Sequence, residues 1–172
     1  IEEKIECVYW MGGSLDGHGN VNDPGFDGTA EWNAFWDPEA VKRVWDSSVP
    51  IRMVGLESSE ELPLNIQFRD HLAKNRRYPA IDLVGQGYAL VLTAEADSTY
   101  YLWDVLTTIY SMYPEVAETE QVKCSVRTDG KAAGRTYRCD DGREVTLVTH
   151  ADKKRFFDIV DRLLMSAEAP VY

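Results

Sequence analysis

The chain has 172 residues, of which 44% are apolar, and this size and composition suit one globular domain with its own core. No stretch approaches the run of about 20 apolar residues that spans a membrane, so a soluble protein is expected, with the cytoplasm favoured. The formal net charge of −11 disfavours nucleic acid as a partner, because an acidic surface repels phosphate groups.

The first elements of the chain have the order of a βαβ unit. Residues 7–11 are apolar throughout, as in a buried strand, Asp37 and Pro38 begin a short helix over 38–47, and residues 49–56 form the next strand. This order predicts a parallel sheet. Open α/β sheets bind ligands beyond the carboxyl ends of their strands. The polar connection 57–63 should therefore meet the loop that leaves the first strand.

Helices and a hairpin region follow. Apolar spacing and nearby prolines predict helices over residues 66–77, 80–96 and 100–110, the last of which ends before Pro114. Turn residues separate three short strands from one another, and an amphipathic helix follows them: strands 121–127, 134–139 and 144–149, and helix 152–165. The expected fold class is α/β, with part of an open, mostly parallel sheet, flanking helices and a small antiparallel hairpin region near the C-terminus.

The three cysteines, Cys7, Cys124 and Cys139, lack the close spacing of a zinc site. Cys7 lies in an apolar run, which favours a buried thiol. Cys124 and Cys139 flank the expected hairpin, so a disulfide and two free thiols both remain open for this pair. The cysteines therefore do not settle the compartment.

The loop between the first strand and the first helix carries the candidate chemistry. It runs from Met11 to Pro38 and holds six of the twelve glycines, and loops of this length are usually functional or disordered. Its aromatic residues need a packing site, which argues for order. Asn20, Glu31 and Asn33 suit a ligand with several hydroxyls, because their side chains donate and accept hydrogen bonds. Turn chemistry with a capping glutamate explains the same residues.

A second candidate pair lies in the helix expected over residues 100–110. Asp104 is assigned to its first turn, where the helix dipole and free N–H groups stabilise a carboxylate. Trp103 precedes it, and core packing is the ordinary role of a tryptophan. From the residues alone, these structural roles are favoured for both. The sequence contains no Ser/His/Asp arrangement and no HExxH, Walker or GxGxxG pattern.

Two separated blocks of sequence resemble the nucleoside hydrolases, or nucleoside N-ribohydrolases. The first block carries MGG, GN, AEWN and DPEA, and the second carries YYLWDVLTTIY followed by VRTDG. The resemblance runs from about residue 4 to residue 166. The tryptophan before the aspartate in the second block is similar to the purine-specific branch of the family. The resemblance thus implies hydrolysis of the N-glycosidic bond of purine ribonucleosides to free base and ribose.

The resemblance also implies a role for each candidate residue. Asn20, Glu31 and Asn33 match the positions that bind the ribose hydroxyls. Asp104 matches a ligand of the catalytic Ca²⁺, whose bound water attacks the sugar. Trp103 matches the aromatic residue that stacks on the purine, and stacking on an indole favours protonation of the leaving base.

The sequence departs from the family in one respect. The family's Asp-rich segment of the type DxDPGxDD, which supplies the other metal carboxylates and the catalytic base, has no counterpart in residues 1–172. These residues are therefore expected to be the C-terminal part, roughly half, of a nucleoside hydrolase-like domain. One carboxylate does not make a Ca²⁺ cage. We hypothesise that a second chain carries the N-terminal half and that the complete fold is a homo-oligomer. A nucleoside-binding module without catalysis and a purely structural protein are the alternatives.

Overall fold

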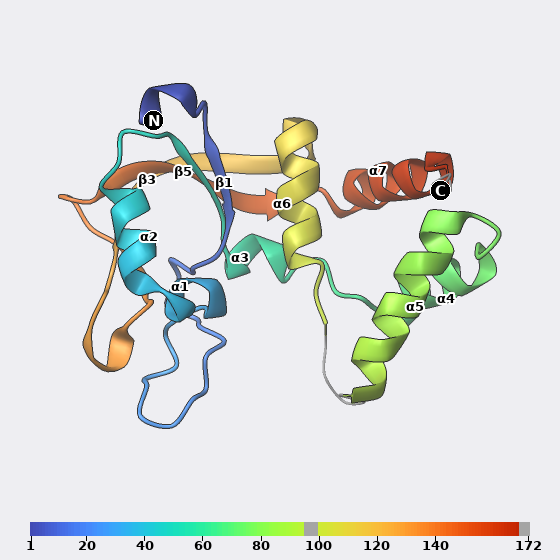
Figure 1. Cartoon of the computed structure of the whole chain (residues 1–172), viewed down its shortest axis with the longest axis horizontal. Helices are drawn as coiled ribbons and strands as arrows, with labels where there is room; N and C mark the ends of the chain where they lie inside the picture. Colours follow the sequence, from blue (N-terminus) through green and yellow to red (C-terminus); the bar gives the residue numbers. More distant parts are fainter. Residues whose placement is uncertain (95–99, 169–172) are drawn as a thin grey trace.

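The computed structural model describes residues 1–94 and 100–168, which contain one mixed sheet (Figure 1). In these residues the strand order is β1-β2-β5-β3-β4. The strands are β1 (Val8–Met11), β2 (Ile51–Val54), β3 (Ala117–Val126), β4 (Thr136–Arg138) and β5 (Arg143–Ala151). β1, β2 and β5 pair in parallel, and β3 pairs antiparallel with both β5 and β4. β3 therefore runs antiparallel to the other four strands of the sheet, and the expected α/β class with an open, mostly parallel sheet and a hairpin region is confirmed.

The helices include two short ones that the sequence did not predict. The α-helices are α1 (Trp32–Trp36), α2 (Pro38–Trp45), α3 (Leu56–Ser59), α4 (Ile66–Lys74), α5 (Pro79–Ala94), α6 (Trp103–Met112) and α7 (Lys153–Ser166). Short 3₁₀ turns span Glu2–Lys4, Pro114–Val116 and Gly130–Ala132. The unpredicted helices are α1 and α3. The helix expected over residues 80–96 corresponds to α5, and its residues 95–96 lie outside the described residues.

The two faces of the sheet pack against different helices. Side chains alternate between the faces of a strand, so Tyr9 and Trp10 of β1 point in opposite directions. The Tyr9 ring lies edge-on to Tyr110 of α6, with 5.8 Å between ring centroids. The Trp10 ring lies edge-on to Trp45 of α2, at 5.1 Å. α2 and α6 therefore cover opposite faces of the sheet near β1.

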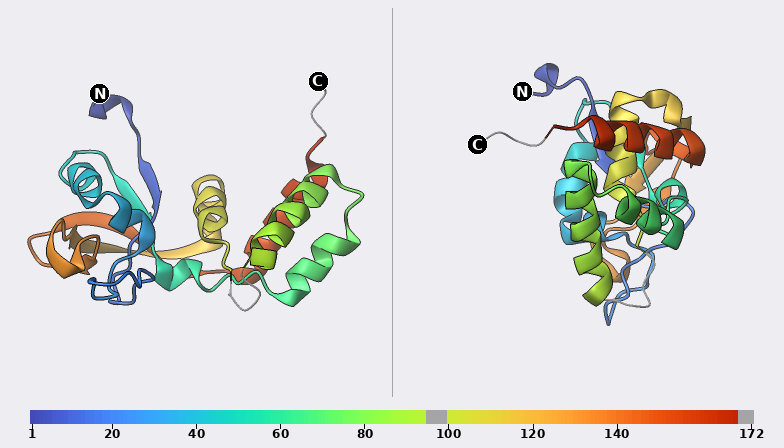
Figure 2. Two further views of the ribbon diagram at one scale, coloured as in Figure 1. Left: turned by 60° about the horizontal axis from the view of Figure 1, so that its bottom comes forward. Right: turned by 90° about the vertical axis from the view of Figure 1, so that its right-hand side faces the viewer.

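Helices α4, α5 and α7 form a separate group at one end of the molecule, with α6 between them and the sheet (Figure 2, left). One buried core joins this group to α6 and to β2 and β5. Its most deeply buried members include Leu72, Ile81, Leu106, Val148 and Phe156. The position of α6 is therefore fixed from both sides.

The cysteines are free thiols. Cys124 lies opposite Arg138 in the β3–β4 ladder, so Cys139 follows the paired position instead of facing Cys124. Of the two alternatives for this pair, free thiols are the one observed. Burial raises the pKa of the Cys124 thiol to about 11. Among the described residues, no helix combines the length and apolar character that a membrane crossing requires.

Candidate functional site

The connections after β1 and β2 meet at the carboxyl ends of these strands, as the βαβ order predicted. The backbone N–H of Leu56 donates to the carbonyl of Gly13, at 3.1 Å. In the other direction, the N–H of Leu15 donates to Glu57 Oε1, at 3.2 Å. The candidate site is built on this junction.

Glu31 is the N-cap of α1 and is 2% exposed. Its Oε1 accepts the N–H of Asn33 at 2.9 Å, and its Oε2 accepts the N–H groups of Gly13 at 2.8 Å and Ala34 at 3.2 Å. Burial raises the pKa of Glu31, and the nearby negative charge of Asp104 raises it further. The three hydrogen bonds act in the opposite direction but do not cancel the rise. The capping role that the sequence left open for Glu31 is confirmed.

Asn20 and Asn33 hold the same loop from either side of Glu31. Asn20 Oδ1 accepts the N–H of Trp32 at 2.9 Å. Asn33 Nδ2 donates to the carbonyl of Met11, the last residue of β1, at 3.1 Å. In the described part of the chain, the structure gives no partner to Asn20 Nδ2 or to Asn33 Oδ1. One donor group and one acceptor atom therefore remain available beside Glu31.

The start of α6 is tied to the segment that follows α3. The N–H of Leu102 donates to the carbonyl of Leu62 at 2.9 Å, and the N–H of Leu64 donates to the carbonyl of Tyr100 at 2.7 Å. This pairing explains why α6 begins at Trp103 and not at Tyr100. It also brings the first turn of α6 to the end of the sheet where β2 finishes.

Trp103 is half-buried in an aromatic cluster with Tyr100 and Tyr101. The ring centroids lie 4.9 Å and 5.5 Å from that of Trp103. The indole Nε1 of Trp103 is buried and has no hydrogen-bond partner within the described residues. Packing is therefore part of its role, as the sequence favoured, but packing leaves one buried donor unexplained.

Asp104 is exposed in the first turn of α6, and its carboxylate makes no hydrogen bond or ion pair within residues 1–94 and 100–168. Its charge nevertheless raises the pKa of Glu31. It also contributes to the pKa of Tyr88 on α5, which burial and the neighbouring Tyr100 raise to about 12. The structure thus brings Asp104 near both α5 and the loop from Met11 to Pro38, here called the glycine-rich loop.

The metal expected from the sequence does not fit these residues alone. In the described ranges, no group of three or more His, Cys, Asp or Glu side chains is arranged to hold a metal ion. Glu31 already accepts three backbone N–H groups. Asp104 remains as one free carboxylate, and Ca²⁺ takes about 6–8 oxygen ligands.

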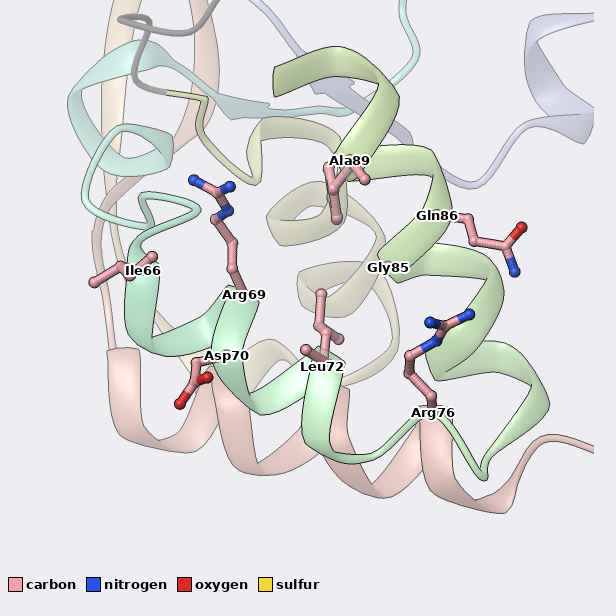
Figure 3. A pocket seen from close by; sticks show the side chains of 10 residues that line it. Ile66, Arg69, Asp70, Leu72, Arg76, Gly85, Gln86 and Ala89 are labelled. Carbon is pink, nitrogen blue, oxygen red and sulfur yellow. The ribbon is translucent and has the colours of Figure 1, made fainter. Parts of the chain in front are cut away.

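A cavity of about 410 Å³ lies between α4 and α5, away from the glycine-rich loop (Figure 3). Figure 3 shows the side chains of Arg69 and Leu72 from α4 and of Gln86 and Ala89 from α5 around it. None of the five candidate residues lines this cavity. Tyr88 lines it and is also near Asp104, so α5 is the link between the two regions.

Sequence reasoning missed two side chains that shape the loop after β1. Thr136 Oγ1 accepts the N–H of Ser14 at 2.8 Å and donates to the carbonyl of Ser14 at 2.9 Å. Glu57 accepts the N–H of Leu15. Thr136 gave no signal, because it is distant in sequence, whereas Glu57 lies in the polar connection that was expected to meet this loop.

A family model and a solved structure both place the chain among the nucleoside hydrolases. A model of the family described as inosine-uridine preferring nucleoside hydrolase matches residues 1–158. The crystal structure of an inosine-uridine preferring nucleoside hydrolase from Bacillus anthracis is similar over 96% of this chain and 53% of that chain, with 45% identity and a TM-score of 0.89.

Two further relatives bear different names. The purine-preferring ribonucleoside hydrolase from Gardnerella vaginalis shares the fold, with 22% identity and a TM-score of 0.71 over 94% of this chain and 54% of that chain. The pyrimidine-specific ribonucleoside hydrolase RihA of Shigella boydii serotype 4 is 27% identical over an alignment of 175 positions that covers 95% of this chain and 54% of RihA. The chain spans about half the length of these relatives.

Proposed function

Because the chain belongs to the inosine-uridine preferring nucleoside hydrolase family, we propose that it forms the ribose- and base-binding part of an enzyme that cleaves purine ribonucleosides. The reaction is hydrolysis of the N-glycosidic bond to free base and ribose. The observation that carries the proposal is the family match over residues 1–158, which includes all five candidate residues.

The ribose is assigned to the free atoms of Asn20, Glu31 and Asn33. A carboxylate has about four acceptor positions, of which Glu31 uses three for backbone N–H groups. Asn20 offers its amide N–H groups, and Asn33 offers Oδ1. Each sugar hydroxyl can both donate and accept a hydrogen bond. Two neighbouring hydroxyls of a ribose can therefore pair with the Asn20 N–H groups, Asn33 Oδ1 and the unused acceptor position of Glu31. A fixed set of partners orients the anomeric carbon for attack.

The base is assigned to the aromatic cluster around Trp103. A purine presents a larger π-face than a pyrimidine, and three rings lie within one cluster at the start of α6. A protonated purine is a cation, which an indole face stabilises, so this stacking supports departure of the base. The names of the relatives include both base classes, and the tryptophan is the feature that favours purines here.

The remaining half of the site is assigned to a companion polypeptide, with Asp104 as one ligand of a shared Ca²⁺. β1 is an edge strand in the described part of the sheet. Val8 and Gly12 donate their N–H groups to residues of β2 or next to it. Successive residues of a strand alternate in direction, so the N–H and C=O groups of Tyr9 and Met11 point to the open edge. The Met11 carbonyl is already bound by Asn33.

A companion strand that pairs in parallel with this edge places its own carboxyl end beside Asn33. Loops at the carboxyl ends of parallel strands carry the ligand-binding groups of open α/β sheets. Carboxylates on the loop that follows the companion strand therefore lie on the side of Asp104. The complete fold is proposed to be a homo-oligomer, as expected from the resemblance.

The test is to co-express the chain with the part of the Bacillus anthracis relative that it does not match, and to purify the complex. We expect release of purine base and ribose from inosine, faster than release of base from uridine. EDTA should abolish this activity and Ca²⁺ should restore it.

The alternative is a module that binds nucleosides without cleaving them, since the described residues alone hold no group of side chains arranged for a metal ion. Quenching of tryptophan fluorescence by inosine, with no sugar released by the complex, would establish that alternative. Absence of both binding and release would reject the proposed function.

A further inference from the structure

Three successive backbone N–H groups in the loop after β1 are each held by a side chain from a different segment. Gly13 donates to Glu31 Oε2 at 2.8 Å, Ser14 to Thr136 Oγ1 at 2.8 Å, and Leu15 to Glu57 Oε1 at 3.2 Å. Local turns usually satisfy such groups with neighbouring backbone. Here α1, β4 and α3 together fix one short stretch of chain.

We propose that Glu57 is a positioning residue for the ribose end of the site. By holding the N–H of Leu15, it fixes the stretch 13–15 and thereby the Gly13 N–H that orients the Glu31 carboxylate. Glu57 itself does not touch the sugar. This role presupposes the nucleoside site proposed above.

The stretch 13–15 transmits the position of Glu57 because Gly13 has little room to adjust. Its φ is +70°, which L side chains rarely adopt, and a Cβ at this position would lie 2.7 Å from Thr136 Oγ1 and 2.8 Å from Met53 Cε. Its carbonyl is bound by the N–H of Leu56. Ser14 joins Gly13 to Leu15, and Thr136 Oγ1 contacts both its N–H and its carbonyl, so little slack remains between the two ends of this stretch.

Space for the Glu57 carboxylate is built into the fold. A Cβ on Gly55 would lie 2.3 Å from Glu57 Oε2, so a side chain at position 55 would displace this carboxylate from its observed place. The same Oε2 is buried without a hydrogen-bond partner in the described residues. An unpartnered buried oxygen costs stability, and such costs concentrate at functional sites. Stability alone does not explain this glutamate.

The closing experiment compares Glu57→Ala and Glu57→Gln with a matched control, Glu61→Ala. Glutamine keeps a carbonyl oxygen that can accept the Leu15 N–H. It also resembles the neutral carboxyl group in shape and charge, and burial, which raises the pKa of Glu57, favours that neutral form. Glu61 lies in the same connection, but its Oε2 accepts the N–H of Ala151 at 3.0 Å and its Oε1 pairs with His150 at 2.8 Å, both away from residues 13–15. The control thus removes one backbone acceptor without touching residues 13–15.

The first readout is the titration of the Glu31 carboxyl carbon by NMR in the isolated chain. The Gly13 hydrogen bond lowers the pKa of Glu31, so its loss in Glu57→Ala should raise that pKa further. Glu57→Gln and Glu61→Ala should leave the Glu31 titration as in the wild type. A Glu31 titration that is unchanged in Glu57→Ala overturns the proposal.

The second readout is inosine affinity in the co-expressed complex. Glu57→Ala should weaken binding about 2–13-fold, the equivalent of one lost hydrogen bond, and Glu57→Gln should restore most of it. On a Glu31→Gln background the same substitution should weaken binding much less, because Glu57 acts through Glu31. Equal losses on both backgrounds would show an independent, merely structural role. If the wild-type complex does not bind inosine, the proposed function fails, while the Glu31 titration still decides the role of Glu57.

Discussion

Replacing Glu31 with alanine tests how strongly this one side chain holds the glycine-rich loop. The substitution removes the cap of α1, worth about 0.5–2 kcal/mol. It also leaves the buried N–H of Gly13 without an acceptor, which costs about 1–3 kcal/mol. We expect the free energy of unfolding to fall by about 2–4 kcal/mol, a large part of the stability of a typical domain.

The assay is urea unfolding followed by tryptophan fluorescence, where a lower midpoint at unchanged m-value reports a loss of stability. Glu31→Gln is the matched variant. It keeps one acceptor oxygen and should lose about 1–2 kcal/mol, since an amide nitrogen then faces a backbone N–H. A loss below about 0.5 kcal/mol for Glu31→Ala would refute the assigned hydrogen bonds.

The pH dependence of the same pair of proteins follows from the raised pKa of Glu31. A carboxyl group with a higher pKa in the folded state contributes most stability when it is protonated in both states, below its ordinary value of 4.5. This contribution is lost as pH rises through the folded-state pKa. The wild type should therefore lose stability relative to Glu31→Gln over that window. A relative gain for the wild type would contradict burial as the dominant cause.

Three further substitutions or modifications have definite expected outcomes. Asp104→Ala should change the free energy of unfolding by less than about 0.5 kcal/mol, because the exposed carboxylate caps no N–H in the described chain. The same substitution should abolish Ca²⁺-dependent turnover in the co-expressed complex. Urea unfolding and the inosine assay measure the two effects. Cys124 should resist iodoacetamide at pH 8 until urea is added, since burial raises its pKa to about 11, and mass spectrometry counts the alkylated thiols. Gly13→Ala should destabilise the chain by about 1–3 kcal/mol, because of its positive φ and the contacts that a Cβ would make, as a shift in the urea midpoint would show.

The sheet could be predicted because its strands carry strong local signals. The apolar run that forms β1 and the turn residues around the hairpin place the strands in order. β3 begins at Ala117, four residues before the expected start at residue 121. No strand signal marks this start in the sequence, because these first residues are mostly exposed and polar, including Glu118 and Glu120. α1 was missed because it has only five residues, too few for a helical pattern, although a capping role for Glu31 was among the alternatives.

The candidate site could be predicted only in part, because its geometry depends on contacts between distant segments. Asn20, Glu31 and Asn33 share one loop, so their spacing already grouped them. Thr136 lies 122 residues from Ser14, which it holds, and no local pattern announces such a contact. The approach of Asp104 to Glu31 likewise depends on the pairing of residues before α6 with residues after α3.

The structural and the ligand-binding interpretations of the loop residues are compatible, because each residue uses only part of its hydrogen-bonding capacity. Asn20 uses its oxygen, Asn33 uses its nitrogen, and Glu31 uses three of about four acceptor positions. The bonds that hold the loop also fix the direction in which the unused atoms point. A sugar that binds them meets groups already in place, so little side-chain entropy is lost on binding.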